Sequence, residues 1–279
     1  MPVVLRIRRP SCFADDLKIS LIIKALNDAR TLQAAIDTLK LWCTRNGADL
    51  NDGKCYVISF TRSNDYIDGG YEINGTTLKR VNTIRDLGVI LDSKLTFKPQ
   101  IEKVVASGKS ILGFIKRRAR EFQDPYLTKQ LFNTLVLPVV EHVSPIWAPY
   151  REVDKKQTES IQKQFLIFAL RHLGFQGPQL PPYRSRLLLI NMISLDDRRK
   201  LASALFTFDT LKNNINVEEL RNRLILNTNT YTTRTRRYLR EETHRTDFAF
   251  YDVLGTAIRN FNHYSNMFDP MMKTIFEST

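Results

Sequence analysis

The hydrophobic pattern of the chain changes its period about a third of the way along. Residues 71–78 alternate apolar and polar positions around Asn74-Gly75, and residues 55–61 are rich in β-branched and aromatic side chains. Such stretches are typical of strands, and Asn-Gly is typical of a hairpin turn. From Pro99 onward, apolar residues recur every three or four positions, which predicts helices. We therefore expect an α+β fold, with short antiparallel strands first and helices after them.

The first third also predicts one helix and a second hairpin. Its apolar residues at helical spacing are Leu32, Ile36, Leu39 and Cys43. Asn27-Asp28 before them are candidates for the amino-terminal cap, and Asn46-Gly47 after them predict the end of the helix. The hairpin is expected from a strand over residues 87–91, a turn at residues 92–94 and a second strand over residues 95–97.

The remaining two thirds predict five helices with one loop among them. The helices are expected over residues 101–115, 127–142, 157–173, 196–211 and 217–226. Residues 174–182, with three prolines and two glycines, are expected to form a loop or linker. These changes of pattern divide the chain into parts at residues 1–98, 99–178 and 179–279. Trp42 and Trp147 both fall within apolar helical patterns, so we expect both in the core.

The charge of the chain favours a polyanionic partner. Its 279 residues have a formal net charge of +13 and a pI of about 9.7. Residues 101–200 hold 17 basic and 9 acidic side chains and account for most of the excess. Three cysteines without CxxC spacing predict neither a disulfide framework nor a zinc site. No segment resembles a signal peptide or a membrane span, so we expect an intracellular protein, nuclear or cytoplasmic.

Two adjacent aspartates, Asp15 and Asp16, stand in the stretch FADDLKI between apolar residues. This pattern suits a tight β-hairpin with the acids at the turn. Carboxylates held close together repel each other, and a divalent cation that prefers oxygen ligands, most often Mg²⁺, stabilises them. The dipeptide alone is better explained as an exposed turn, so the surrounding sequence has to decide between these interpretations.

The surroundings of the aspartates resemble reverse transcriptases. FADDLKI is similar to the aromatic-Ala-Asp-Asp signature of motif C in the polymerase palm. Three more stretches follow in the order seen in jockey-like non-LTR retrotransposons of insects: "WC..NG" at residues 42–47, "LN..KC" at residues 50–55 and "DLGV.LD..L.F" at residues 86–97. The second of these three resembles motif D, and the third resembles motif E, the primer grip. The helical stretch that contains Trp147 and Gln162 is similar to the region after the palm in the same elements.

This resemblance implies a fold, a cofactor and roles for several residues. The fold is a partial polymerase palm followed by a helical thumb and a helical carboxyl-terminal region. Asp15 and Asp16 would hold Mg²⁺, and Lys54 would stabilise or protonate the departing pyrophosphate. Gly88, in the primer grip, would let the backbone approach a nucleic-acid strand. Without the resemblance, Lys54 is better explained as a solvated lysine, and for Gly88 a β-bulge is an equal alternative.

The resemblance also implies that the polymerase is incomplete. Only 14 residues precede Asp15 and none is acidic, so we expect motif A, motif B and the fingers to be missing. Two carboxylates without the third are expected to bind Mg²⁺ weakly and not to build a two-ion site. The expected function is that of a carboxyl-terminal fragment of an RNA-directed DNA polymerase, inactive alone, with the missing amino-terminal portion as a partner. The alternative is a decayed or domesticated nucleic-acid-binding module without catalysis.

Two basic clusters are candidate contacts to an RNA template and to an RNA–DNA or DNA duplex. The first comes at the end of the helix expected from Pro99 and resembles a polymerase thumb: Lys109, Lys116, Arg117, Arg118 and Arg120. The second is Arg234, Arg236 and Arg237, with Tyr231 or Tyr238 as candidates to stack on bases. The first cluster is also consistent with a solvated helix end. The second is also consistent with a surface loop.

Overall fold

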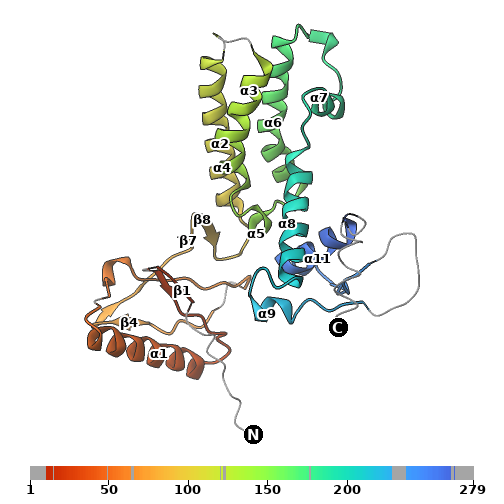
Figure 1. Ribbon diagram of the computed structural model, residues 1–279. Coiled ribbons are helices and arrows are strands. Elements are labelled where there is room, and N and C mark those ends of the chain that lie inside the picture. The colour runs from red at the N-terminus through yellow and green to blue at the C-terminus, as the bar shows by residue number, and fades with distance from the viewer. Residues whose placement is uncertain are drawn as a thin grey trace. The chain divides into compact units, whose positions relative to one another are not determined.

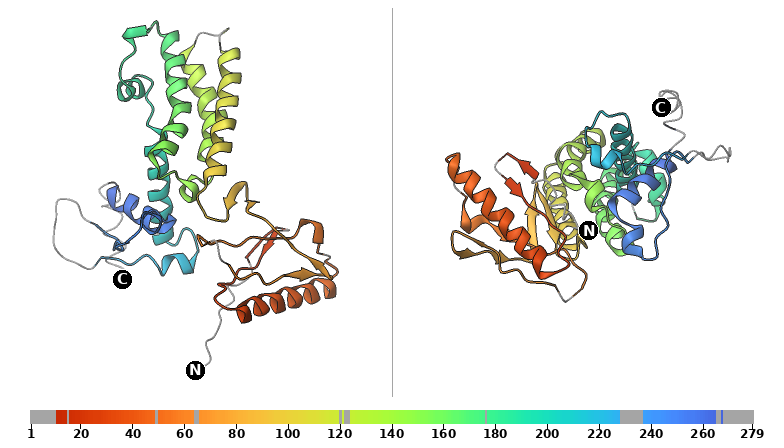
Figure 2. Two further views of the ribbon diagram at one scale, coloured as in Figure 1. Left: turned by 180° about the vertical axis from the view of Figure 1, so that it is seen from behind. Right: turned by 90° about the horizontal axis from the view of Figure 1, so that it is seen from below.

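The computed structural model describes residues 11–14, 16–48, 50–63, 66–119, 121, 124–175, 177–227, 237–264 and 267 (Figures 1 and 2). The chain divides into two compact units, residues 1–96 and residues 97–279. The first unit contains pairs of short strands and one long helix, and the second is helical. The expected α+β fold is therefore confirmed.

The FADDLKI stretch forms the hairpin that the sequence predicts. Strands β1 (Ser11–Phe13) and β2 (Asp16–Lys18) pair antiparallel, with Phe13 opposite Asp16. Ala14, directly after β1, has a left-handed φ of 49°. A positive φ at a turn residue reverses the chain within a tight connection. Asp15 lies outside the described residues.

Helix α1 (Leu26–Arg45) covers the short strands of the first unit with its apolar face. Ala29 and Ile36 are buried in one cluster with Tyr71 and Ile73. The cap differs from the prediction, because the N-cap residue is Ala25 and Asp28 acts from inside the first turn. The Asp28 carboxylate accepts hydrogen bonds from the backbone N–H groups of Lys24 (2.7 Å) and Ala25 (2.8 Å). The helix ends at Asn46-Gly47, as expected.

The other strands of the first unit form separate two-stranded ladders. Their bounds, with one 3₁₀ turn, are η1 (Asp52–Lys54), β3 (Tyr56–Val57), β4 (Glu72–Ile73), β5 (Thr76–Thr77), β6 (Lys79–Arg80), β7 (Thr83–Asp86) and β8 (Val89–Asp92). The hairpin of β4 and β5 around Asn74-Gly75 is confirmed. Strands β3 and β6 pair parallel, whereas the sequence predicted antiparallel pairs only.

The prediction of a hairpin with its turn at residues 92–94 is wrong. The hairpin joins β7 to β8, with Thr83 opposite Asp92, and the turn lies at Leu87-Gly88. Both turn residues have positive φ, 44° and 87°, as in the type I′ turns that match the twist of hairpin strands. Asp92 instead accepts a 3.0 Å hydrogen bond from the backbone N–H of Thr96, in the turn that precedes the first helix of the second unit.

The second unit is built from helices (Figure 1). Their bounds are α2 (Lys98–Arg118), α3 (Pro125–Leu131), the π-helical turn η2 (Phe132–Val136), α4 (Leu137–Glu141), α5 (Ser144–Trp147), α6 (Glu152–His172), the 3₁₀ turn η3 (Gly177–Gln179), α7 (Tyr183–Leu189), α8 (Leu195–Leu211), α9 (Glu218–Arg221), α10 (Asp247–Phe250) and α11 (Val253–His263). The helix expected over residues 217–226 forms only over the four residues of α9. Helix α11 was not predicted.

Helices α2 and α6 run parallel and close together. A Cβ atom added to Gly108 of α2 would lie 2.8 Å from Cδ1 of Ile161 of α6, which is closer than side chains normally approach. Phe132 and Phe165, both fully buried, stack beside this contact with ring centroids 4.2 Å apart. The absence of a side chain at Gly108 lets the two helix backbones approach.

The two tryptophans behave differently. Trp147 is 1% exposed and its indole N–H donates a 2.8 Å hydrogen bond to the carbonyl of His142, so its prediction as a core residue is confirmed. Trp42 is 59% exposed, so its prediction is wrong. Neighbouring Cys43 faces the core of the first unit, and consecutive helical residues point about 100° apart.

A buried polar network joins α6 to the start of α8. The carboxylate of Glu159 accepts hydrogen bonds from the Tyr183 hydroxyl and from the backbone N–H of Leu195 (3.1 Å). The side-chain oxygen of Gln162 accepts from the same two donors, at 3.2 and 3.0 Å, and its amide group donates to the carbonyl of Ile193 (2.9 Å). The segment between α7 and α8 is therefore fixed to α6 by several hydrogen bonds.

We expect this network to weaken at high pH. Burial raises the pKa of Tyr183 above its ordinary value, and the hydrogen bond to Glu159 and its negative charge act in the same direction. A pKa raised in the folded state contributes stability that is complete below the unfolded value of about 10 and is lost above it. The free energy of unfolding should therefore fall above pH 10 by up to about 1.4 kcal/mol per pH unit from this group. Urea unfolding between pH 8 and 11 measures it.

The matched variant for this measurement is Tyr183→Phe. At pH 8 its free energy of unfolding should be lower than that of the wild type, because Glu159 loses a hydrogen-bond donor. Above pH 10 its free energy of unfolding should fall less steeply, because the variant has no hydroxyl at position 183 to titrate. Other tyrosines cancel in the difference between the two proteins. Parallel stability curves for wild type and variant would contradict the assignment.

The carboxyl-terminal helix α11 packs against α8. Phe208 of α8 and Phe261 of α11 share one buried cluster with Leu239. The side chain of Asn262 exchanges two hydrogen bonds with the backbone of Leu239, at 3.0 and 2.9 Å. Within the described part of the chain, no helix has the length and apolar character needed to cross a membrane.

Candidate nucleic-acid interface

Asp16 is the first residue of β2 and is exposed. Lys18, two positions later, points to the same face of the strand, and its ammonium group forms an ion pair with Asp86 at the end of β7. This ion pair links the hairpin of β1 and β2, which we call the acidic hairpin, to the hairpin of β7 and β8. It also places a positive charge on the face of β2 that presents Asp16. Asp15, the other predicted metal ligand, falls in the part of the chain that is not described.

The described residues do not fit a two-metal site. No group of three or more His, Cys, Asp or Glu side chains within the described ranges is placed to hold a metal ion. Catalysis by two ions requires carboxylates that clamp both of them 3.5–4 Å apart, and Mg²⁺ requires a nearly octahedral set of oxygen ligands. Asp16 alone supplies neither.

Lys54 and Gly88 lie in separate turns of the first unit. Lys54 ends η1, just before β3, and its side chain is exposed. No hydrogen bond or ion pair joins it to Asp16 within the described residues. Gly88 occupies the second position of the turn between β7 and β8, where its φ of 87° suits glycine. Its place is explained by the hairpin turn and not by a β-bulge.

The carboxyl-terminal ends of α2 and α6 bring together basic residues from distant parts of the sequence. Lys116, Arg117 and Arg118 form the last turn of α2, and Arg171 belongs to the last turn of α6. Burial lowers the pKa of Lys116, and the positive charge of Arg171 acts in the same direction. Sequence reasoning missed Arg171 because it lies far along the chain from the lysines and arginines at the end of α2. The parallel packing of α2 and α6 makes it part of the cluster.

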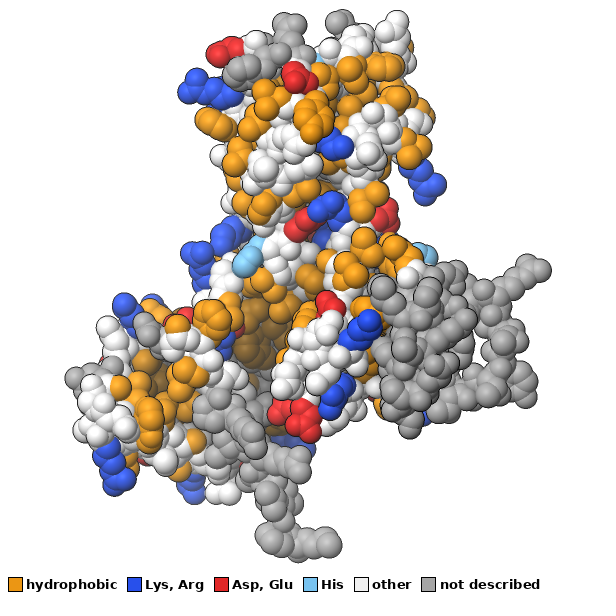
Figure 3. Space-filling view, in the orientation of Figure 1, with side chains coloured by type: hydrophobic (Ala, Val, Ile, Leu, Met, Phe, Trp, Pro, Cys, Tyr) orange, Lys and Arg blue, Asp and Glu red, His pale blue; other side chains and the backbone are white. Residues whose placement is uncertain are grey.

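The basic residues of α2 point in more than one direction. Lys109 and Lys116 are seven positions apart and therefore share a face, whereas Arg118 turns to the opposite side and lies over the ring of Phe114. In the view of Figure 3, Lys and Arg side chains project from the bundle near the end of α2. Cations at helix carboxyl termini also interact favourably with the helix dipole, so part of their role is local. Arg120 is not among the described residues.

The second basic cluster is only partly described. Arg234, Arg236 and Tyr231 lie outside the described residues. Arg237 is exposed, but a terminal nitrogen of its side chain lies 3.9 Å from a carboxylate oxygen of Glu241, which offsets its charge. Tyr238 is 1% exposed, so its prediction as a base-stacking residue is wrong. Its ring packs in the cluster formed by α8 and α11.

Comparison with known proteins relates part of this chain to a reverse transcriptase. The chain is 35% identical over 92 residues to "RNA-directed DNA polymerase from mobile element jockey" of Drosophila funebris. The match covers 32% of this chain, which spans about 10% of the length of that relative. No protein-family model and no solved structure matches the chain. The relationship is therefore distant and partial.

Proposed function

We propose that this chain is the part of a retrotransposon reverse transcriptase that runs from the acidic hairpin of the palm through the thumb to the carboxyl-terminal helices. The observation that carries the proposal is the β1–β2 hairpin, which begins its second strand at Asp16, as motif C requires. The distant relationship to the jockey polymerase supports it. The order of elements after the hairpin, a helix, short strands and then a helical unit, agrees with the order of the motifs.

The role of the chain in that proposal is to hold the template–primer duplex. Lys116, Arg117, Arg118 and Arg171 lie at one end of the packed pair of helices α2 and α6. Such a cluster neutralises backbone phosphates and positions a duplex without reading its sequence. Polymerisation needs further carboxylates, which we propose are supplied by a polymerase portion outside the described residues.

A second candidate function is nucleic-acid binding without catalysis. The observation that favours it is the basic cluster at the ends of α2 and α6, because phosphate contacts from lysine and arginine need no catalytic metal site. In this case the basic helix ends bind nucleic acid, and the acidic hairpin contributes only to the fold.

Both functions require that the chain binds nucleic acid. Fluorescence anisotropy with a labelled RNA–DNA hybrid that has a recessed 3′ end tests this binding. For three to five neutralised phosphates, the affinity should fall roughly 40- to 500-fold between 50 and 200 mM salt, with a linear dependence on the logarithm of the salt concentration. A binding constant that does not change with salt would contradict both functions.

Primer extension separates the two functions. The chain alone in Mg²⁺ should not extend the primer, whereas a mixture with a polymerase fragment that carries motif A should extend it. Asp15→Asn and Asp16→Asn should abolish this extension and leave duplex binding unchanged. If the mixture binds the duplex but never extends the primer, the polymerase proposal fails and the binding module remains.

A further inference from the structure

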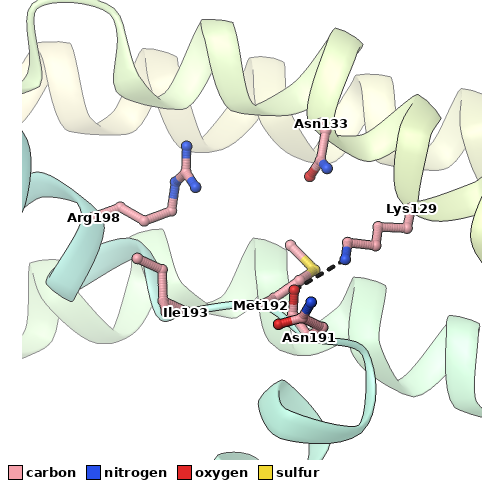
Figure 4. Close-up of a pocket in the computed structure, with 6 residues that line it drawn as sticks. All are labelled: Lys129, Asn133, Asn191, Met192, Ile193 and Arg198. Carbon is pink, nitrogen blue, oxygen red and sulfur yellow. Dashed lines mark hydrogen bonds between the residues drawn. The ribbon is translucent and has the colours of Figure 1, made fainter.

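A cavity of about 240 Å³ in the second unit is lined mainly by polar side chains. Its lining residues are Lys129, Asn133, Asn191, Met192, Ile193 and Arg198. Lys129 belongs to α3, Asn133 to the π-helical turn η2, and Arg198 to the first turns of α8. Figure 4 shows the polar ends of these three side chains turned toward the same space. The segment between α7 and α8 forms the opposite wall.

The polar side chains at this cavity are hydrogen-bond donors, and some of their N–H groups are not used within the described part of the chain. The ammonium group of Lys129 donates to the backbone carbonyl of Asn191 (3.0 Å), which uses one of its three N–H groups. The guanidinium of Arg198 binds the carboxylate of Glu141 through Nε and Nη2 (2.9 Å for Nη2). Within the described ranges, Nη1 of Arg198 and the side-chain amide of Asn133 have no hydrogen-bond partner.

The charge and the size of the cavity favour a small anion. Two of the six lining residues are cations and none is acidic, which disfavours a metal ion. Glu141 offsets the charge of Arg198, so the net positive charge at the cavity comes from Lys129. Arginine and lysine together are typical of phosphate sites, because arginine offers a planar fork and lysine a compact charge. Pockets for drug-sized ligands run to about 300–1,000 Å³. A cavity of about 240 Å³ fits a phosphate group with a neighbouring sugar better than a larger ligand.

Hydrogen bonds within the chain hold two parts of the cavity wall. The carbonyl of Ile193 accepts a hydrogen bond from Gln162, and Glu141 holds Arg198 in place. The side chain of Asn133 projects from a π-helical turn, and such turns inside α-helices occur frequently at functional sites. Groups that are already held in place bind a ligand with a smaller cost of ordering.

We propose that this cavity binds one phosphate group, with Lys129 supplying positive charge and with Nη1 of Arg198 and the side-chain amide of Asn133 donating hydrogen bonds to its oxygens. The phosphate comes either from a nucleic-acid backbone, as a phosphodiester, or from a free phosphate. The backbone source rests on the proposed function, whereas the phosphate site itself does not. The site is formed by residues other than the basic ends of α2 and α6.

The test is a titration of the full chain labelled with ¹⁵N-asparagine, followed by NMR of the side-chain amide signals. The probes are inorganic phosphate and the dinucleotide TpT, whose one phosphate is a phosphodiester. The signals of Asn133 and Asn191 should shift and saturate. Lys129→Met should weaken binding about tenfold and Asn133→Ala about threefold, read on the Asn191 signal. Lys156→Gln, on the exposed side of α6, is the matched control and should leave binding unchanged.

The outcome of the titration shows whether the site exists and which source of phosphate it binds. Saturation with TpT supports the nucleic-acid backbone as the source, and saturation with inorganic phosphate alone supports a free phosphate. No saturable shift with either probe, or equal binding by wild type and Asn133→Ala, would overturn the site. Asn133 makes no side-chain hydrogen bond within the described residues, so its loss should not unfold the chain. A chain that binds the RNA–DNA hybrid but neither probe would retain the proposed function and lose this inference.

Discussion

Replacing Glu159 with glutamine is expected to lower the free energy of unfolding of the second unit by about 3–5 kcal/mol, as measured by urea denaturation. Glu159 is 8% exposed, and its carboxylate accepts hydrogen bonds from the Tyr183 hydroxyl and from the backbone N–H of Leu195. Its other oxygen faces the backbone N–H of Asp196 at 3.3 Å. A glutamine amide would direct its own N–H₂ group at one of these donors.

The loss of charge at Glu159 adds to the loss of hydrogen bonds. Arg199 is 3% exposed, and its three guanidinium nitrogens have no hydrogen-bond partner within the described residues. Burial lowers the pKa of Arg199, while Asp196 and then Glu159 act in the opposite direction. Removing the Glu159 charge therefore leaves a buried cation with less compensation, and breaking such an arrangement from one side is strongly destabilising.

Two control variants make this prediction specific. Glu152→Gln changes the same side chain at the exposed start of α6, where Glu152 pairs with Lys155, and should change stability by less than about 0.5 kcal/mol. Arg199→Met removes a cation that has no hydrogen bond and lies 3.8 Å from a carboxylate oxygen of Asp196, while Glu159 keeps its donors, so its loss of stability should be smaller than that of Glu159→Gln. A loss for Arg199→Met as large as that for Glu159→Gln would contradict this account of the network.

Sequence patterns predicted those elements whose signals are local. The hairpin at FADDLKI, the helix over Leu26–Arg45 and the turn at Asn74-Gly75 follow from turn residues and from apolar spacing. The turn at Leu87-Gly88 was missed because leucine rarely adopts a positive φ, and Asp92 in the following segment suggested a turn there. Asp92 does act locally, but as a hydrogen-bond acceptor in the turn before α2.

The parts of the sites that depend on tertiary packing were not predictable in the same way. Arg171 joins the basic cluster only because Gly108 lets α6 approach α2. The phosphate-sized cavity requires Asn133 from a π-helical turn and Arg198 from α8 to meet, and no sequence period indicates this. Tyr238 carried a plausible signal for base stacking, but the packing of α11 buries it.

Neutralising the basic end of α2 is expected to weaken binding to an RNA–DNA hybrid by roughly 100-fold at 100 mM salt, or about 2.7 kcal/mol. The variant is Lys116→Gln combined with Arg117→Gln and Arg118→Gln. Each lost phosphate contact should also reduce the slope of log affinity against log salt by about 0.9. Fluorescence anisotropy across a range of salt concentrations measures both quantities.

The matched control removes three cations from the opposite ends of the same two helices. Lys103→Gln, Lys155→Gln and Lys156→Gln make the same change in net charge, in the first half of α2 and at the start of α6. An attraction due to the overall charge of +13 would weaken equally in both triple variants. A loss confined to the first variant would identify a local phosphate contact at the helix ends, because the two proteins differ only in where the charge was removed. Equal losses would show that the chain binds nucleic acid through its net charge and has no thumb-like contact at this end.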